Sequence, residues 1–426
     1  MSEERERVDL LIHSASQVLT LAGGPQRGRR LGQLAIIEGG AVAIDGGRIT
    51  EVGDSDLLRG RLDPSDEIDA AGRVVMPGFV DPHTHLIWAG DRSAEFEQRL
   101  AGVPYLEILK QGGGILSTVR QTREASQGDL VEAARPRLQR MLQYGTTTAE
   151  AKTGYGLDTE TEIRMLAAVL ALDGDGPCDL APTLLGGHAV PPEFEGDPDG
   201  YCAMVCDQML PAARDWWGQH AGARPLPFFD VFCEEGAFDV EQSRRMLTAA
   251  AKLGFSLKVH ADEFVGLGGT ALAVELGATS VDHLVETPPD DIAAVGNSVT
   301  VAVALPCTPF GLGQERYTPA AAFLEAGAVL AIATDLNPGT APCESMQFAI
   351  AVACRQMGLT PAQAIAAATI NAAAAIGLAE DRGGLEQGMI ADLLILDADD
   401  YRQLGYRFGT NLVAQVIKRG QAVWSA

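Results

Sequence analysis

Residues 78–85 read GFVDPHTH, a short apolar run that ends in Asp81, Pro82 and two histidines separated by one residue. Side chains two positions apart on a strand point to the same face, so His83 and His85 are expected on one face at a strand's carboxyl end. Seven further runs have the same form, and stretches of helical periodicity separate most of them. They are TTTAEAKTGY (146–155), LAPTLLGGHAV (180–190), FFDVFCEEG (228–236), SLKVHADE (256–263), TSVDHLVE (279–286), TVAVALPC (300–307) and VLAIATDLNPG (329–339).

Eight strands alternating with helices predict an α/β fold in which a parallel sheet closes into a (β/α)8 TIM-like barrel. A doubly wound open sheet is the alternative. Outside the eight runs, the first 75 or so residues and the last 40 or so carry β-branched runs broken by Gly and Asp. Both ends are therefore expected to build one small β domain. The predicted division is 1–76 with 388–426 for that domain, and 77–387 for the barrel.

Composition excludes several classes of protein. The 426 residues carry a net charge of −25, from 32 Lys and Arg against 57 Asp and Glu, and 46% are hydrophobic. This hydrophobic content excludes intrinsic disorder, and the acidity argues against nucleic acid or an anionic membrane surface as a partner. The start, MSEERERVDL, lacks the apolar segment of a signal peptide, and no apolar run reaches roughly 18 residues. Seven scattered cysteines favour the reducing cytoplasm. Cys202 and Cys206, one helical turn apart, are predicted to be two buried thiols on an apolar helix face.

Five of the seven histidines lie at or near the ends of predicted strands. They are His83, His85, His188, His260 and His283, and Asp335 ends the eighth strand in the same way. Active sites of barrels form at this carboxyl face, because the loops there converge on one mouth. The other two histidines are expected to be structural, His13 in a terminal strand and His220 in a loop.

Four of these side chains predict a metal site: His83, His85, His260 and Asp335. Each alone could be a satisfied core polar group, but four at consistent strand ends favour one ion with nitrogen and oxygen ligands. This donor set suits zinc or iron with a position open for water. Such an ion serves hydrolysis, for which Glu263 is the predicted proton carrier and His283 a second catalytic group. The alternatives are a helix-start carboxylate for Glu263 and an orienting role for His283.

Longer motifs carry a resemblance to the amidohydrolase superfamily, from about residue 70 to the C-terminus. They are DPHTHLIWAGDRSAEFEQRL (81–100), YLEILKQGGGILSTVRQTREAS (105–126), GTTTAEAKTGYGL (145–157), LLGGHAVPPEF (184–194), VHADEF (259–264) and ATDLNPGTAPCESM (333–346). The resemblance implies a metal-dependent barrel flanked by a β-sandwich made from both chain ends. Within the superfamily, the chain is most similar to the hydrolases of histidine degradation that open the ring of 4-imidazolone-5-propanoate, giving N-formimidoyl-L-glutamate.

The resemblance also implies roles for particular residues. The metal ligands fall on the four residues named above, and the substrate contacts fall on Arg92, Tyr155, His188, Glu263, Asn337, Gly339 and Thr340. Arg92 suits the substrate's propanoate, because guanidinium binds carboxylate bidentately. Tyr155 lies between two glycines and is expected to be an exposed loop aromatic, although by itself it could equally well be a packing residue. The turn 337–340 is expected to offer amide groups. The run 228–236 has no lysine to be carbamylated, so one metal ion per subunit, divalent or trivalent, is expected.

Two other functions stay open at this point. One is another mononuclear amidohydrolase, such as a deaminase of a heterocycle, and the other is a barrel that lost its chemistry. Arg92 argues against a neutral nucleobase, and the retained ligand set argues against a scaffold. The segment LPCTPFGLGQERYTPA (305–320) looks less typical of the family, which leaves the lid undefined. A homodimer is the expected assembly, since symmetric dimers are the commonest.

Overall fold

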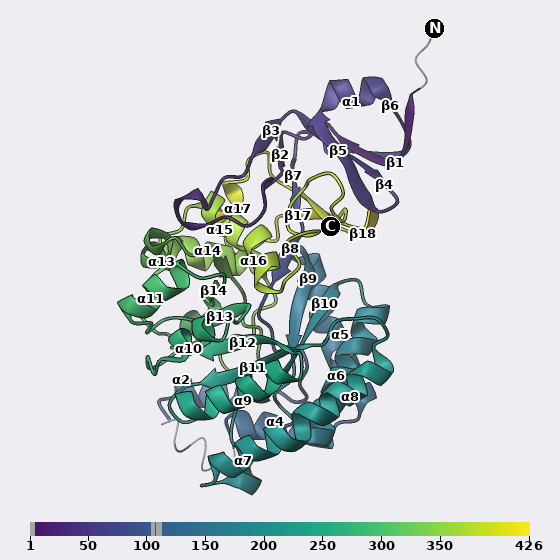
Figure 1. Cartoon of the computed structure of the whole chain (residues 1–426). Coiled ribbons are helices and arrows are strands. Elements are labelled where there is room, and N and C mark those ends of the chain that lie inside the picture. Colours follow the sequence, from purple (N-terminus) through teal and green to yellow (C-terminus); the bar gives the residue numbers. More distant parts are fainter. Residues whose placement is uncertain (1–4, 104–106, 108–112) are drawn as a thin grey trace.

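The computed structural model describes residues 5–103, 107 and 113–426. Its centre is one sheet of eight parallel strands that follow one another in chain order (Figure 1). The strands are β8 (Phe79–Asp81), β9 (Thr146–Lys152), β10 (Asp179–Gly187), β11 (Phe228–Cys233), β12 (Ser256–Ala261), β13 (Ser280–His283), β14 (Val301–Ala304) and β15 (Leu330–Ile332). Seven lie within the predicted runs, and β10 begins one residue before its run, so the strand predictions are confirmed.

Backbone contacts beyond the ends of β8 and β15 bring the first and last strands together. A parallel bridge pairs Thr84 with Leu336, the Asp335 N–H donates to the His83 carbonyl (3.1 Å), and the His85 N–H donates to the Leu336 carbonyl (2.8 Å). The sheet is therefore a (β/α)8 barrel, and the doubly wound alternative is wrong. The join lies at the carboxyl face, where three candidate metal ligands occur.

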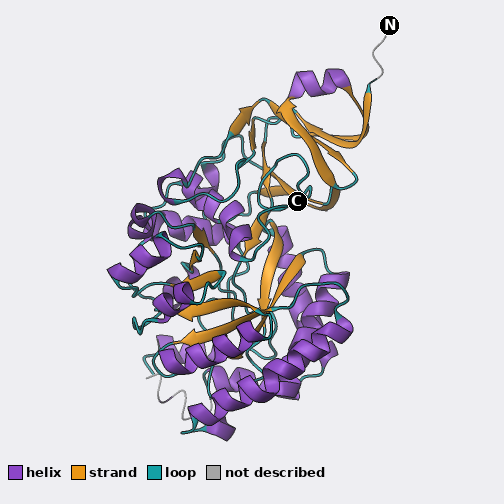
Figure 2. Ribbon diagram, viewed as in Figure 1, coloured by secondary structure: helices purple, strands orange, loops and turns teal. Residues whose placement is uncertain are grey.

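Helices surround the barrel (Figure 2). The capping box of α9 illustrates why they form: Asp239 accepts the N–H of Gln242, whose side chain accepts the N–H of Asp239. The helices around the sheet are α2 (Ser93–Leu100), α4 (Ile115–Glu124), α5 (Gln127–Gln143), α6 (Thr159–Asp175), α7 (Pro198–Met204), the π-helical turn η3 (Val205–Met209), α8 (Leu210–His220), α9 (Val240–Lys252), α10 (Gly269–Glu275), α11 (Pro289–Gly296), α12 (Cys307–Leu312), α13 (Ala320–Ala326), α14 (Met346–Gln356), α15 (Pro361–Ala367) and α16 (Ile370–Ala375).

The position of His220 corrects one sequence prediction, and part of one family motif lies beyond what the structure describes. His220 ends helix α8 and does not lie in a loop: its Nδ1–H donates to the Trp216 carbonyl (2.7 Å), one helical turn earlier. Part of the family motif at 105–126, namely residues 105, 106 and 108–112, lies outside the described residues.

Two smaller sheets stand beside the barrel at the top of Figure 1. The six-stranded sheet joins the chain ends, because β7 pairs antiparallel with β16. It contains β2 (Gln17–Leu19), β3 (Ile36–Glu38), β7 (Val74–Pro77), β16 (Leu393–Leu396), β17 (Val413–Lys418) and β18 (Gln421–Ser425). The four-stranded sheet uses N-terminal residues alone: β1 (Glu6–His13), β4 (Gly40–Asp45), β5 (Arg48–Asp54) and β6 (Leu62–Asp69), with helix α1 (Ser55–Arg61) packed on it. The small helices η1 (Gly28–Arg30), η2 (Pro192–Phe194) and α17 (Gln403–Tyr406) complete the described elements.

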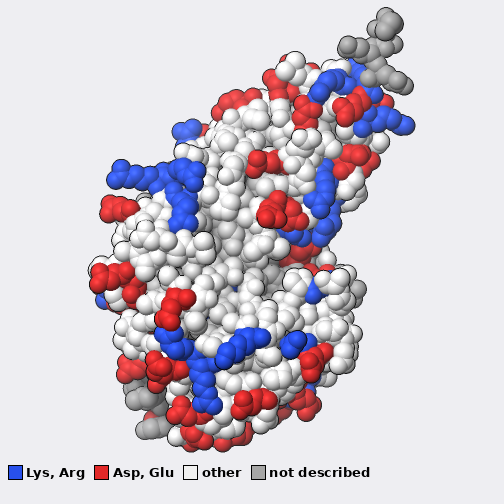
Figure 3. Space-filling view, viewed as in Figure 1, with Lys and Arg blue, Asp and Glu red and all other residues white. Residues whose placement is uncertain are grey.

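The surface carries charges of both signs. On the face in Figure 3, acidic side chains are scattered, and basic ones gather in a band over the lower part of the barrel. The net charge of −25 therefore does not form one acidic field on this face. Among the described residues, no helix is both long and apolar enough to cross a lipid bilayer.

Candidate functional site

The four predicted metal ligands meet at the carboxyl end of the barrel. His83 and His85 follow β8, His260 lies in β12 and Asp335 follows β15. Nε2 of His85 lies 3.4 Å from Nε2 of His260, and Oδ1 of Asp335 lies 3.5 Å from Nε2 of both His83 and His85. All four residues are at most 3% exposed. Residues separated by as much as 250 positions in the chain thus present their polar atoms to one point.

The arrangement fits a metal ion. With bonds of about 2.1 Å, the edges of a tetrahedral coordination shell are about 3.4 Å long, close to the separations above. Nε2 of His83 and Oδ1 of Asp335 are buried and have no hydrogen-bond partner among the described residues. Leaving such atoms without a partner is costly, and a bound cation removes that cost. Three imidazole nitrogens and one carboxylate oxygen are a donor set that zinc and iron accept.

Further contacts fix how these side chains face the centre. The Nδ1–H of His83 donates to Oδ2 of Asp282 (2.6 Å), and Nδ1 of His260 lies 2.9 Å from Oδ2 of Asp230. Burial lowers the pKa of His83 well below its ordinary value, and nearby Lys152 lowers it further. This imidazole is therefore neutral, as a metal ligand must be.

The carboxylate of Asp335 is held in place through Oδ2, the oxygen that does not face the histidines. The Thr308 hydroxyl donates to Oδ2 (2.5 Å), which leaves Oδ1 facing the histidines. Burial raises the pKa of Asp335 to about 6. Its φ of 55° lies in the left-handed region, where backbone strain is typical of functional sites.

Glu263 and His283, the two predicted catalytic residues, lie together beside this cluster. Nε2 of His283 is 3.5 Å from Oε2 of Glu263, and Glu263 is 8% exposed. Burial raises the pKa of Glu263 well above its ordinary value, and the carboxylate of Asp335 adds to this. A nitrogen of His283 also lies within 4.8 Å of polar atoms of His83 and Asp335. The structure thus brings a proton-holding carboxyl and an imidazole next to the candidate metal ligands.

Aromatic rings form one wall. His85 stacks on His188 with ring centres 5.0 Å apart, and Tyr155 lies 5.3 Å from His188. Nδ1 of His188 donates to the Gly154 carbonyl (2.9 Å), so its Nε2 is free to accept a hydrogen bond. Burial lowers the pKa of His188 to about 3, so the ring is neutral. Tyr155 is only 3% exposed, so the expectation of an exposed aromatic is wrong and the packing alternative is correct: its ring packs beside His85 and His188.

The predicted substrate-binding turn exists, but its amides are not free. The carboxamide oxygen of Asn337 accepts the N–H groups of Gly339 and Thr340, both at 2.8 Å. The prediction that this turn offers amide groups is therefore corrected, because the Asn337 side chain closes an Asx turn on itself. Arg92 lies against the turn: a Cβ placed on Gly339 would stand 2.4 Å from its Nη1. The other side of the guanidinium contacts Glu95, at 3.0 Å from Nε and 2.9 Å from Nη2.

Sequence reasoning missed five fully buried charged side chains inside the barrel: Glu150, Lys152, Asp230, Lys258 and Asp282. Lys152 contacts Glu150 and Asp230, and Lys258 contacts Glu150. The signal was present, because charged residues interrupt runs that a parallel barrel should bury. Lys258 precedes His260 by two positions and so shares its face of the strand.

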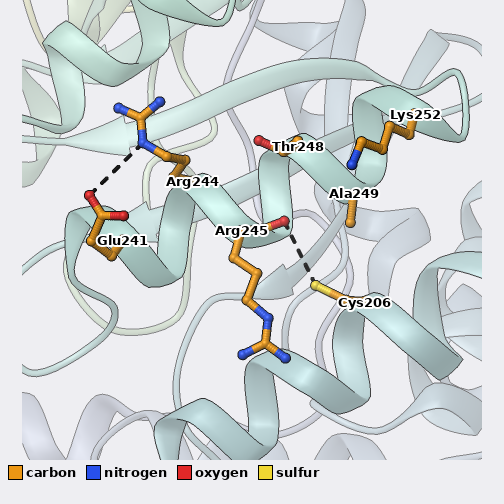
Figure 4. A pocket seen from close by; sticks show the side chains of 7 residues that line it. All are labelled: Cys206, Glu241, Arg244, Arg245, Thr248, Ala249 and Lys252. Carbon is orange, nitrogen blue, oxygen red and sulfur yellow. Dashed lines mark hydrogen bonds and ion pairs between the residues drawn. The ribbon is translucent and has the colours of Figure 1, made fainter.

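One surface pocket lies apart from this cluster (Figure 4). It has a volume of about 380 Å³ and is lined by Cys206, Glu241, Arg244, Arg245, Thr248, Ala249 and Lys252. The Cys206 thiol contacts the Arg245 carbonyl (3.8 Å), and Cys202 is buried. The prediction that both thiols are buried is therefore confirmed for Cys202 and wrong for Cys206, which is partly exposed and lines the pocket.

Comparisons with known proteins agree with this picture. Residues 74–423 match the model of the Amidohydrolase family. The chain is 54% identical over 422 residues to the imidazolonepropionase of Chloroflexus aggregans, covering 98% of this chain and 99% of that protein. It is 51% identical over 416 residues to the imidazolonepropionase of Herpetosiphon aurantiacus, covering 97% of both.

Solved structures with a similar fold are more distant in sequence. An adenosine deaminase from Xanthomonas campestris with bound zinc aligns with a TM-score of 0.70 at 19% identity, covering 98% of this chain and 93% of that one. Atrazine chlorohydrolase from Arthrobacter aurescens complexed with zinc aligns with a TM-score of 0.67 at 17% identity, covering 98% and 95%. At identities this low, the likeness supports only the fold, that is, the barrel and its flanking sheets. It does not indicate a substrate.

Proposed function

The chain belongs to the imidazolonepropionases of the amidohydrolase family, and we propose that it hydrolyses 4-imidazolone-5-propanoate to N-formimidoyl-L-glutamate, the third step of histidine degradation. The observation that supports this proposal most strongly is the 54% and 51% sequence identity to two of these enzymes over nearly their whole length. The cluster at the carboxyl end of the barrel adds the side chains that hydrolysis needs: four candidate metal ligands, with Glu263 and His283 beside them. A deaminase of a heterocycle is disfavoured, since the chain's high-identity relatives are imidazolonepropionases and its likeness to a deaminase is one of fold.

We propose that His83, His85, His260 and Asp335 hold one metal ion per subunit, zinc or iron. The support is the grouping of His83, His85 and His260, with Oδ1 of Asp335 3.5 Å from Nε2 of both His83 and His85. Nε2 of His83 and Oδ1 of Asp335 also lack a partner among the described residues. When bound, such an ion supplies Lewis acidity, which polarises a carbonyl oxygen and makes water a better nucleophile at neutral pH.

Glu263 is proposed as the proton carrier. It takes a proton from the attacking water while the water oxygen bonds to the ring carbonyl carbon. The ring C–N bond then breaks, and Glu263 returns the proton to the departing nitrogen, which becomes the terminal nitrogen of the formimidoyl group. Burial of Glu263 suits this role, because its raised pKa lets the carboxyl hold the proton between the two steps. His283, 3.5 Å away, is proposed to hold Glu263 in place and to donate to the developing oxyanion.

The remaining predicted residues are proposed to orient the substrate. Arg92 binds the propanoate through Nη1, beside Gly339, and the Asn337–Thr340 turn keeps that guanidinium in position. Tyr155 and His188 face the ring, and the free Nε2 of His188 accepts a ring N–H. Fixing both ends of the substrate turns orientation into rate.

We propose the domain division of the sequence prediction: residues 77–387 as the catalytic barrel, and 1–76 with 388–426 as a β-sandwich. The pairing of β7 with β16 supports it. We also propose a homodimer in the cytoplasm, acting on this small molecule without nucleic acid or membrane partners. The seven thiols, which form no disulfide in the structure, suit a reducing compartment.

The test is ring opening by the purified protein. Freshly made 4-imidazolone-5-propanoate should lose its ring ultraviolet absorbance, and the product should carry one added water by mass. Release of ammonia in place of ring opening would instead indicate a deaminase. A flat trace with metal-loaded, folded protein would overturn the proposal.

A further inference from the structure

Five charged side chains fill the centre of the barrel next to the metal-ligand cluster. Three are carboxylates, Glu150, Asp230 and Asp282, and two are ammonium groups, Lys152 and Lys258. All five side chains are 0% exposed. Such positions in a parallel barrel are usually filled by Val, Ile or Leu. Replacing buried ion pairs by apolar residues is often neutral or stabilising, so fold stability alone gives weak reason for this network.

The carboxylates of the network contact two of the candidate ligands. Asp282 accepts the Nδ1–H of His83 at 2.6 Å through Oδ2, and Oδ2 of Asp230 lies 2.9 Å from Nδ1 of His260. The Asp282 carboxylate can only accept, so it draws the His83 proton to Nδ1 and leaves Nε2 as a lone pair. Nδ1 of His260 faces Asp230 at ion-pair distance, without hydrogen-bond geometry. In His83 that lone pair lies 3.5 Å from Oδ1 of Asp335, inside the cluster.

Lys152 joins these two carboxylates. Its Nζ donates to Oδ2 of Asp230 (2.7 Å) and lies 3.8 Å from Oδ2 of Asp282, the same oxygens that face the histidines. It also donates to Glu150 (2.9 Å). One ammonium group therefore bridges the supports of two ligands that come from different strands.

Lys258 approaches His83 from the backbone side. Its Nζ donates to the carbonyl of Pro82, the residue before His83, at 2.9 Å. It also lies 3.0 Å from Oε2 of Glu150 and 3.7 Å from Oδ2 of Asp282. Asp282 thus holds the ring of His83, and Lys258 holds the backbone just before it, so two members of the charged network fix this residue.

We propose that this network is built for metal binding, and that Lys152 is a positioning residue that holds Asp230 and Asp282 so that His260 and His83 present Nε2 to the ion. This inference rests on the metal site proposed above. Without the Lys152 ammonium, three buried carboxylates share one remaining cation, and their mutual repulsion displaces them from the histidines. Loss of such an outer partner typically weakens metal affinity by 10- to 100-fold.

The test compares Lys152→Met with Lys418→Met. Lys418 is a matched control, because it is also a buried lysine between two carboxylates, Asp179 (2.8 Å) and Asp392, but lies in β17 outside the barrel. The readouts are the zinc Kd from chelator competition and the visible absorption of the cobalt-loaded protein. Both variants should lose thermal stability, but only Lys152→Met should bind zinc at least tenfold more weakly and change the cobalt bands.

Unchanged zinc Kd and cobalt bands in Lys152→Met would overturn the proposal and leave the network a purely structural feature. If Lys152→Met fails to fold, Asp282→Asn tests the next contact of the same network, because it removes the carboxylate charge that faces His83, Lys152 and Lys258 and keeps the size of the side chain. A tenfold weaker Kd in Asp282→Asn supports the proposal, and a wild-type Kd refutes it. Failure of the proposed metal site would look different, since wild-type protein itself would then bind no zinc or cobalt there, whereas a different substrate would leave the zinc Kd of the wild type intact.

Discussion

A methyl group added at Gly339 would strike Arg92, the side chain proposed to bind the substrate's propanoate. An added Cβ would stand 2.4 Å from Nη1 and 3.0 Å from Cζ of Arg92. Glu95 holds the opposite side of the guanidinium, so the group cannot simply swing away. Gly339 has no left-handed φ, so alanine fits its backbone and the substitution acts through the contact with Arg92.

The size of the effect follows from that distance. Ordinary contacts between such atoms are about 3.5 Å, so the guanidinium must move by about 1 Å. A misplacement of about 1 Å can cost about 100-fold in rate. We therefore expect Gly339→Ala to lower kcat/KM by about 100-fold, or about 2.7 kcal/mol. Most of the loss should be in KM, because the propanoate lies away from the bond that breaks.

Steady-state kinetics on 4-imidazolone-5-propanoate measure this effect. Gly218→Ala in α8 is the control, because beyond its chain neighbours and the backbone of its own helix its added Cβ would meet no atom within 4 Å. Its kinetics should equal those of the wild type. On an Arg92→Ala background, Gly339→Ala should add little, since the atoms it would strike are gone. Wild-type KM in Gly339→Ala, or full additivity with Arg92→Ala, would refute the reasoning.

Three further predictions concern other parts of the chain. Glu263→Gln should lower kcat by about 10²- to 10⁴-fold without reducing metal content, and near-wild-type kcat would exclude Glu263 as the proton carrier. Thr308→Val should weaken zinc binding by about tenfold, measured by chelator competition, because Oδ2 of Asp335 loses its donor; an unchanged Kd would contradict this. Asp179→Asn should cost about 2 kcal/mol in urea unfolding at pH 7, since Asp179 is 20% exposed and paired with Lys418. Burial works to raise the pKa of Asp179, but Lys418 and its other cationic partners hold it below the ordinary value. Its stabilisation is therefore complete above about pH 4 and is lost as the pH falls through the lowered pKa, and a difference that stays constant down to pH 2 would refute this assignment.

The strands, and the grouping of the four proposed metal ligands, were predictable because each leaves a local pattern. A short apolar run that ends in polar residues marks a buried parallel strand, and all eight predicted runs contain strands in the structure. In five of the eight runs a His or Asp also marks the carboxyl end. His83, His85, His260 and Asp335 could be placed together because the carboxyl ends of barrel strands share one face.

The sequence did not predict the contacts that side chains make in the loops and helix ends beyond the strands. Tyr155 looked exposed because glycines flank it, yet the loop buries it beside His188. The Asn337 turn looked open, but its own carboxamide takes the amides of Gly339 and Thr340. His220 looked like a loop residue because the turns of α8 around it contain Gly and Trp.

The buried charges were missed for a different reason. Lys152 and Asp230 lie on separate strands, 78 positions apart, and each alone resembles a charge at a strand's exposed edge. Only the closed barrel brings them within 2.7 Å. Pairing across a barrel is a property of the strand registers, which hydrophobic periodicity alone does not specify.

The central claim is that one metal ion, held by the four strand-end ligands, is required for opening the imidazolone ring. The most direct measurement adds zinc or ferrous iron stepwise to metal-depleted protein and follows ring hydrolysis by ultraviolet absorbance. Activity should be absent at the start, rise in proportion to added metal, and stop rising at one equivalent per subunit. Full activity in the metal-depleted protein, or a rise that continues to two equivalents, would contradict the account.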